Sequence, residues 1–169
     1  MRIVCLDTQV LYWGIIGKAS RGQDDLIPRA RDFLVGLAAD DNIHVIIPAV
    51  VVGELLAFVP EAEQANVLMR LQQDWLVVDF DARAALIFGQ MRANRFVQEQ
   101  FKALRGDGPD LNRRALIADC LIIATAIAHD AEVLYSDDRA LIKLAEGWIA
   151  AKRFEDETYQ MRLLDEDDR

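Results

Sequence analysis

One long apolar stretch of this chain carries a single charged side chain. Residues 115–128 read ALIADCLIIATAIA, and Asp119 is the only charged residue among them. A helix that is apolar on every side is a buried helix, and a carboxylate inside one costs several kcal/mol unless a cation or good donors compensate it. The stretch contains no Lys or Arg. The sequence therefore predicts a buried helix whose carboxylate receives its positive charge from elsewhere.

Other acidic residues stand at or just after predicted strands. Asp7 ends the segment RIVCLD, Glu54 lies one or two helical turns past the segment HVII, and Asp137 and Asp138 follow EVLY. Ligands of an open parallel sheet bind beyond the carboxyl ends of its strands, so these distant acids can converge at one edge. Together they would repel one another without cations. Hard oxygen ligands suit Mg²⁺ or Mn²⁺, and the lack of Cys and His clusters disfavours zinc.

Predicted strands alternate with predicted helices along the chain. Short apolar segments typical of buried parallel strands occur at 2–7, 44–47, 75–78 and 132–135. The stretches between them predict helices at 8–16, 26–40, 48–58, 61–74, 82–105 with a break near Asn94, 111–129 and 139–146. We expect an α/β fold, a three-layer α/β/α sandwich around a central parallel β-sheet. The domain is expected over residues 1–150, and an acidic C-terminal extension over 151–169, with an edge strand near 158–163.

Composition limits the class of protein. A chain of 169 residues with 53% hydrophobic and 28% charged residues is typical of one globular domain. The net charge of −9 argues against a simple basic surface for nucleic acid. No apolar run reaches the ~18 residues of a membrane span, so no membrane partner is expected. Cys5 and Cys120 lie in apolar segments, which favours buried thiols in a reducing, cytoplasmic compartment.

Four segments of the chain resemble the four motifs of the PIN-domain family, in order and at suitable spacing. They are LDTQVLY at 6–12, PAVVVGELL at 48–56, ADCLIIATAIA at 118–128 and VLYSDDRAL at 133–141. The resemblance covers about residues 2–146. It implies a PIN-like fold and the activity of the VapC-like metal-dependent ribonucleases, which use Mg²⁺ or Mn²⁺ and act mostly on RNA. Gln9 departs from the family pattern, in which Asn or Ser is usual.

The resemblance also implies which residues form the site. Asp7, Glu54, Asp119 and Asp138 correspond to the catalytic acids that hold the metal. The fourth motif has two adjacent acids, and alignment on Ser136 assigns the ligand role to Asp138. The hydroxyls of Thr8 and Ser136, with the carboxylate of Asp137, are expected around these acids, fixing carboxylates or waters.

Contacts with substrate and partners are also predicted. Arg113 and Arg114 precede the apolar helix and are candidates for phosphate contacts, while Tyr12, Trp13 and Phe96 are candidates for base stacking. The partners that follow from the resemblance are an RNA substrate, an antitoxin protein and a second copy of the chain in a homodimer.

Each acid also has an ordinary structural interpretation, which stays open at this point. Asp7 can end a strand, Glu54 can be a surface residue, and Asp119 can be the N-cap of a helix that starts at Cys120. Asp137 and Asp138 can form a capping turn. The functional hypotheses are accordingly three: a metal-dependent endoribonuclease, a non-catalytic PIN module that binds RNA or a protein partner, and an unrelated phosphate enzyme or phosphoacceptor.

Overall fold

Five parallel strands form the central sheet, in the order β3-β2-β1-β4-β5. The computed structural model describes residues 1–103 and 111–157. Its strands are β1 (Arg2–Leu6), β2 (Ile43–Pro48), β3 (Leu76–Val78), β4 (Val133–Tyr135) and β5 (Ala150–Lys152). In the central strand, Val4 pairs with Val45 of β2 on one side and with Val133 of β4 on the other. The predicted parallel sheet is confirmed.

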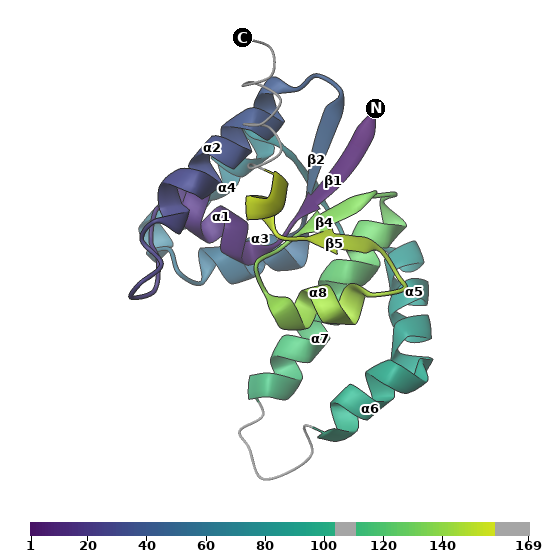
Figure 1. Cartoon of the computed structure of the whole chain (residues 1–169). Helices are drawn as coiled ribbons and strands as arrows, with labels where there is room; N and C mark the ends of the chain where they lie inside the picture. The colour runs from purple at the N-terminus through teal and green to yellow at the C-terminus, as the bar shows by residue number, and fades with distance from the viewer. Residues whose placement is uncertain (104–110, 158–169) are drawn as a thin grey trace.

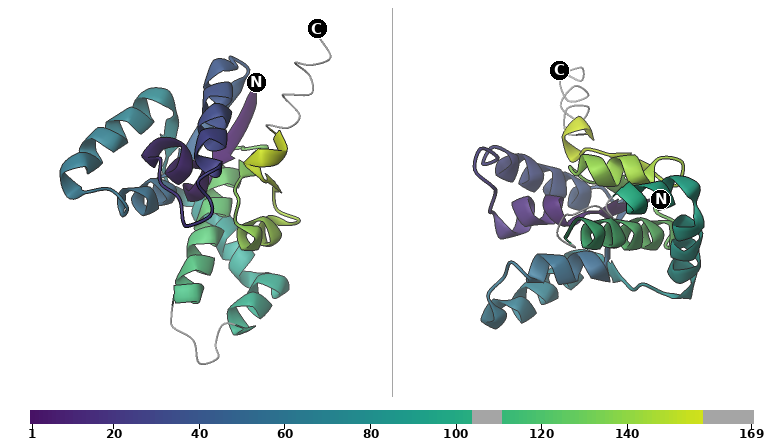
Figure 2. Two further views of the ribbon diagram at one scale, coloured as in Figure 1. Left: turned by 60° about the vertical axis from the view of Figure 1, so that its left-hand side comes forward. Right: turned by 90° about the horizontal axis from the view of Figure 1, so that it is seen from below.

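Helices cover both faces of this sheet. They are α1 (Thr8–Leu11), the π-helical turn η1 (Tyr12–Ile16), α2 (Leu26–Ala39), α3 (Ala49–Leu56), α4 (Glu61–Asp74), α5 (Ala82–Ala93), α6 (Arg95–Ala103), α7 (Leu111–Ala128) and α8 (Arg139–Ala145). Parallel crossovers are right-handed, so connections that advance in opposite directions across the sheet lie on opposite faces. Accordingly α2 and α4 lie on one face and α7 and α8 on the other (Figures 1 and 2), which makes the expected three layers.

Local signals in the sequence explain where the helices begin and end. Asp81 caps α5 by accepting a hydrogen bond from the backbone N–H of Ala84. The predicted break in the long helical stretch falls at Asn94, whose side-chain oxygen accepts a hydrogen bond from the N–H of Phe96 at 2.9 Å. Such a cap starts a new helix in a new direction. The break therefore turns α6 away from α5, toward the N-terminal half of α7 (Figure 1).

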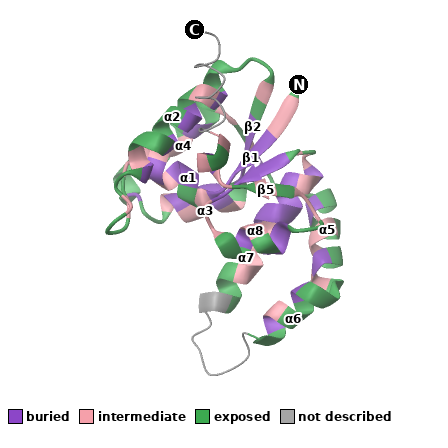
Figure 3. Cartoon of the chain, viewed as in Figure 1, coloured by how far each residue is buried: buried purple, intermediate pink, exposed green. Residues whose placement is uncertain are grey.

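The apolar helix α7 is buried as predicted, and the sheet is buried with it. Cys120, Ile122, Ile123, Ala124 and Ala126 of this helix are all at most 1% exposed. Figure 3 shows the same burial along β1 and β4, whereas the outer surfaces of α5 and α6 are largely exposed. Burial of each large aliphatic side chain stabilises the fold by roughly 1.5–3 kcal/mol. Helix α7 is thus fixed rigidly against the sheet, and so is the position of its one carboxylate.

The segment that follows α8 belongs to the folded domain. β5 pairs with β4 in register, Val133 opposite Ala150 and Tyr135 opposite Lys152. This strand was not predicted, because three residues of sequence AAK carry no periodic pattern. Residues 150–157, of which 151–157 were expected in an extension, therefore include the edge strand of the sheet. The edge strand expected near 158–163 lies outside the described residues.

Phe154 anchors this segment in the core. Its side chain is fully buried, and its ring centroid lies 5.8 Å from that of Trp13 and 5.7 Å from that of Phe33. Glu157 adds polar contacts, since it accepts a hydrogen bond from the Tyr135 hydroxyl at 2.6 Å and one from Arg2 at 3.5 Å. Both ends of the described chain are therefore joined through β4.

No helix in the described parts of the chain has the length and the continuous apolar character that a membrane span requires.

Substitution of Phe154 tests this arrangement. We expect Phe154→Ala to lower the free energy of unfolding by about 3–5 kcal/mol, because it removes a buried ring between two aromatic partners. Phe80→Ala is the matched control, because Phe80 is 40% exposed, and it should cost no more than about 1 kcal/mol. Urea denaturation followed by circular dichroism measures both. Equal losses in the two variants would contradict the assignment of residues 150–157 to the folded domain.

Candidate metal centre

The order of the strands reverses between β1 and β4. From β1 the chain proceeds through β2 to β3 at one edge, then crosses back to β4 and β5 on the other side of β1. Such a switch point opens a crevice beyond the carboxyl ends of the strands, where α/β proteins bind ligands. Asp7 directly follows β1, and Ser136 directly follows β4. Both predicted site residues therefore lie at the switch point.

Asp7 is held from both sides of this crevice. One carboxylate oxygen, Oδ1, accepts a hydrogen bond from the backbone N–H of Thr8 at 2.7 Å. The other oxygen, Oδ2, accepts from the Ser136 hydroxyl at 2.6 Å. Asp7 is 5% exposed and also begins α1 as its N-cap. The carboxylate is thus fixed in place, while each oxygen keeps a second lone pair for a ligand.

Glu54 and Asp138 flank Asp7, each held by a bond of its own. The Thr8 hydroxyl donates a hydrogen bond to Glu54 Oε2 at 2.5 Å. Asp138 is the N-cap of α8, and its Oδ1 accepts from the N–H of Ala140 at 2.7 Å. Its own backbone N–H donates to Ser136 Oγ at 3.0 Å. Ser136 therefore connects the two aspartates, and the capping role of Asp138 is compatible with a place at the site.

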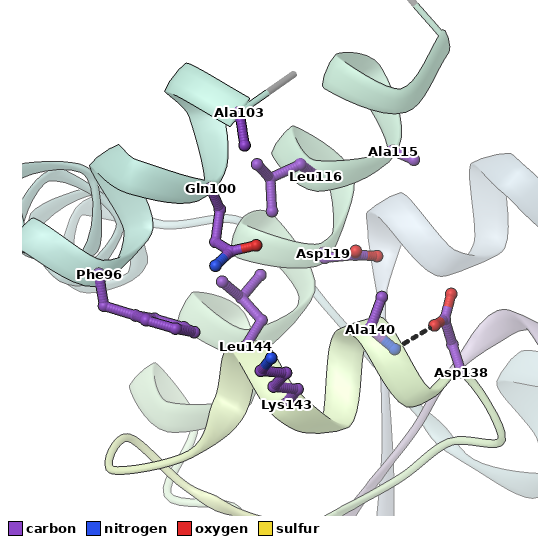
Figure 4. A pocket seen from close by; sticks show the side chains of 10 residues that line it. All are labelled: Phe96, Gln100, Ala103, Ala115, Leu116, Asp119, Asp138, Ala140, Lys143 and Leu144. Atoms are coloured by element: carbon purple, nitrogen blue, oxygen red, sulfur yellow. Dashed lines mark hydrogen bonds between the residues drawn. The ribbon is translucent and has the colours of Figure 1, made fainter.

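Asp119 reaches the same crevice from the interior of α7. The helix begins at Leu111, so the alternative in which Asp119 is an N-cap is wrong. No described residue forms a hydrogen bond with its carboxylate. Asp119 and Asp138 line one cavity, and their carboxylates lie on the same side of it in Figure 4.

Burial and the charges of neighbouring acids raise the pKa values of Asp7 and Asp119. Burial raises the pKa of Asp7 to about 6, against the hydrogen bonds from Ser136 and Thr8, and the charges of Glu54 and Asp138 raise it further. Burial likewise raises the pKa of Asp119 to about 7, with further increases from Asp138, Asp7 and Glu54. No Lys or Arg of the described residues is among the groups that act on either pKa. The four acids thus share one electrostatic environment, in which the pKa values of Asp7 and Asp119 are raised and no described Lys or Arg lowers them.

Asp137, in contrast, is paired with a basic residue, Arg153. Its Oδ1 accepts a hydrogen bond from Arg153 Nε at 2.5 Å, and its side chain is only 14% exposed. Arg153 also pairs with Glu155, which in turn pairs with Arg29. An aspartate engaged in a charge-assisted bond has less free acceptor capacity than one without it. The structure therefore separates the two adjacent acids of the fourth motif by their partners.

The predicted phosphate contacts lie at some distance from this cluster along α7. Arg113 and Arg114 are exposed in the first turn of α7, and neither lines the cavity beside Asp119. The basic residue that does line it is Lys143 of α8. Sequence reasoning missed Lys143, although Ala140, Lys143 and Leu144 have the spacing of one helix face, the face that borders the cavity.

The donor set suits a divalent cation, although the side chains do not enclose one as they stand. Among the described residues, no group of three or more His, Cys, Asp or Glu side chains is arranged to hold a metal ion. Mg²⁺ normally binds through one or two carboxylates and keeps several waters, so it does not need a closed cage of protein ligands. A buried acid (Asp7) and a half-buried one (Asp119), both with raised pKa values and with oxygen donors nearby, fit this ion and not zinc.

Comparison with known proteins identifies the family of this chain. The sequence matches the family model of the PIN domain over residues 4–147. The chain belongs to the PIN-domain family. Members of this family are typically metal-dependent nucleases. No curated protein sequence matches the chain.

Solved structures share this PIN-domain fold. The chain is similar to chains in the structures of VapBC2 from Rickettsia felis bound to a DNA fragment from their promoter (18% identity, TM-score 0.59), DNA-bound VapBC from Salmonella typhimurium (18%, 0.58) and VapBC-1 from nontypeable Haemophilus influenzae (16%, 0.57). The matches cover 89%, 91% and 90% of this chain and 98%, 99% and 98% of the respective chains. At these identities the likeness concerns the fold.

The raised pKa of Asp119 predicts a specific pH dependence of stability. The pKa of Asp119 is higher in the folded state than in the unfolded state, so the folded protein binds its proton more tightly. The contribution of Asp119 to the free energy of unfolding therefore falls as pH rises from about 4 to about 7. Without divalent cations, Asp119→Asn should raise the free energy of unfolding at pH 8 by about 1–3 kcal/mol, and the gain should vanish near pH 4.

Urea denaturation at both pH values, in the presence of a chelator, measures this difference. Asp137→Asn is the matched control, because it breaks the bond to Arg153 and should destabilise the protein at pH 8. A loss of stability in Asp119→Asn at pH 8 would contradict the uncompensated charge described above.

Proposed function

We propose that this PIN domain is a Mg²⁺- or Mn²⁺-dependent endoribonuclease that hydrolyses phosphodiester bonds of RNA. The observation that carries the proposal is the acidic cluster itself: burial raises the pKa values of Asp7 and Asp119, Glu54 and Asp138 raise both further, and no Lys or Arg of the described residues is among the groups that act on either. Families of unrelated function also place acids at strand ends. The family match over residues 4–147 favours nuclease chemistry over the activities of those unrelated families.

The four acids have distinct proposed roles. Asp7 is the deepest of them and is fixed by Ser136 and Thr8, so it would be the principal ligand. Asp119 would bind the same ion from α7. Asp138 would complete the shell directly or through water with its Oδ2, since its Oδ1 caps α8. Glu54, fixed by the Thr8 hydroxyl, would orient the attacking water or hold a second ion.

A divalent ion in such a site lowers the pKa of its bound water and neutralises charge on the phosphate. The residues of the chain fix the positions of the ligand carboxylates. Ser136 and Thr8 hold carboxylates that would otherwise repel one another, because each donates a hydrogen bond to one of them. Arg153 keeps Asp137 outside this group, so that a further negative charge does not oppose the approach of a phosphate.

A place as the toxin of a toxin–antitoxin pair is part of this proposal. It is supported by the fold that the chain shares with the VapBC structures. An adjacent gene for a small DNA-binding protein that forms a complex with this chain would support it, and the mass of the purified chain in solution would test the expected homodimer.

Substitutions in the first and fourth motifs test the nuclease and its ligands together. We expect Asp7→Asn and Asp138→Asn each to reduce cleavage of single-stranded RNA in Mn²⁺ by at least about 100-fold, because each removes a charged ligand. Asp137→Asn is the neighbouring control and should retain more activity than Asp138→Asn, since its carboxylate binds Arg153. Cleavage of a labelled oligonucleotide in a gel assay gives the rates. Full activity in Asp7→Asn would refute the mechanism.

Metal binding has a readout that does not depend on catalysis. An ion that binds only the folded protein stabilises it by about 2.7 kcal/mol at 100 times its Kd. Millimolar Mn²⁺ should therefore raise the Tm of the protein, and Asp119→Asn should reduce this increase, because it removes one of the two acids with raised pKa values. Differential scanning fluorimetry with and without chelator measures the effect. An unchanged Tm at millimolar metal would count decisively against the site.

A further inference from the structure

A cavity of about 320 Å³ is lined by Asp119 and Asp138 and also by side chains that the proposed chemistry does not use. Its lining comes from one face each of α6, α7 and α8 (Figure 4). Phe96 and Gln100 stand four residues apart on α6, and Ala140 and Lys143 three apart on α8, which are the spacings of side chains on one helix face. Among the described residues, the cavity is therefore formed mainly where three helices pack together.

The polar and aromatic groups of this cavity follow one another in space. In Figure 4 the Phe96 ring lies at one end and Asp119 and Asp138 at the other, with Gln100 and Lys143 between them. Neither Gln100 nor Lys143 makes a side-chain hydrogen bond or ion pair with another described residue. An aromatic ring, an amide and an ammonium group thus remain available next to the proposed reaction centre.

Small residues keep the cavity open. Ala103, Ala115 and Ala140 occupy positions where a longer side chain would project into it. Its volume is at the lower end of the range of small-molecule sites, which suits one nucleotide and excludes a duplex. Phe96 remains 38% exposed, although an aromatic ring of its size is normally stabilised by burial.

We propose that Phe96, Gln100 and Lys143 form a binding site for one unpaired nucleotide of the RNA strand, next to the phosphate that is cleaved. The base stacks on the Phe96 ring, the Gln100 amide contacts the edge of the base, and the Lys143 ammonium binds the phosphate on the side of the acids. This inference rests on the proposed nuclease function and specifies its substrate as single-stranded. Base stacking on aromatic side chains and contacts from cationic groups are the usual means of holding single strands.

The other aromatic candidates are engaged elsewhere. Trp13 is 3% exposed and packs on Phe154, and the Tyr12 ring lies 5.0 Å from that of Phe58. Phe96 is therefore the stacking residue that the structure favours among the three predicted from the sequence.

Binding measured without cleavage tests the site. In full-length protein carrying Asp7→Asn, with Mg²⁺ present, a fluorescent single-stranded oligoribonucleotide of mixed sequence is titrated and its anisotropy recorded. Phe96→Ala should weaken binding by about 5- to 100-fold through loss of stacking, and Phe96→Trp should restore it. Phe80→Ala, a control of similar exposure outside the cavity, should stay within about twofold of the parent.

Two further variants probe the cavity and the charge. Ala115→Leu fills the cavity from an exposed helix position and should weaken binding without loss of thermal stability. Lys143→Met should lower the slope of log binding constant against log salt by about 0.7, the value for one phosphate contact with a single strand. Lys152→Met removes the same charge from β5, away from the cavity, and should leave the slope unchanged.

The outcomes distinguish this site from the proposed function. Loss of binding in Phe96→Ala, with no cleavage by the unmodified protein in any divalent metal, would support the site and overturn the nuclease. Cleavage by the unmodified protein, with binding and KM unchanged in Phe96→Ala, would overturn the site alone. If Phe96→Ala weakened the binding of duplex RNA as much as that of single-stranded RNA, the site would also be overturned, because a paired base cannot stack on Phe96.

Discussion

The end of β1 is where this fold must accommodate a charge that its surroundings disfavour. Asp7 directly follows β1, one of the two strands that flank the switch point, and its carboxylate accepts hydrogen bonds from the Thr8 N–H and the Ser136 hydroxyl. Two hydrogen bonds offset part of the cost of burial, and the neighbouring carboxylates add to that cost. A folded chain that keeps such an arrangement without a cation loses stability. The positions of Thr8, Ser136 and α7 are therefore best understood as consequences of holding Asp7 where an ion can reach it.

Asp138 illustrates why structural and functional interpretations of an acid need not compete. One of its oxygens caps α8, which is an ordinary structural role. The same residue raises the pKa values of Asp7 and Asp119, so it belongs to the acidic cluster as well. A cap fixes the side-chain torsion angles, and a fixed carboxylate loses less entropy when it binds an ion. At Asp138 the local structure of the turn thus prepares the remaining oxygen for a ligand.

The layered fold and the grouping of the acids followed from the sequence because their signals are local and strong. The apolar run around Asp119 specified a buried helix, and short apolar segments specified parallel strands. By contrast, β5 has three residues of sequence AAK and owes its conformation to pairing with β4. The difference between Asp137 and Asp138 could not be read from their shared motif, because it depends on Arg153, 16 residues away from Asp137. The cavity near Phe96 was equally hidden, since it exists only where α6, α7 and α8 meet.

The contact between Arg2 and Glu157 places the beginning of the first strand next to the last described residue of the chain, with 3.5 Å between guanidinium nitrogen and carboxylate oxygen. Because these two positions lie this close, the connection that circular permutation needs, from residue 157 to residue 2, can be short. Such a connection, with new ends opened in the exposed turn at residues 40–42, would preserve all four strand pairings while moving β1 from the first strand synthesised to the last. The order in which the strands leave the ribosome could then be varied independently of the site they build.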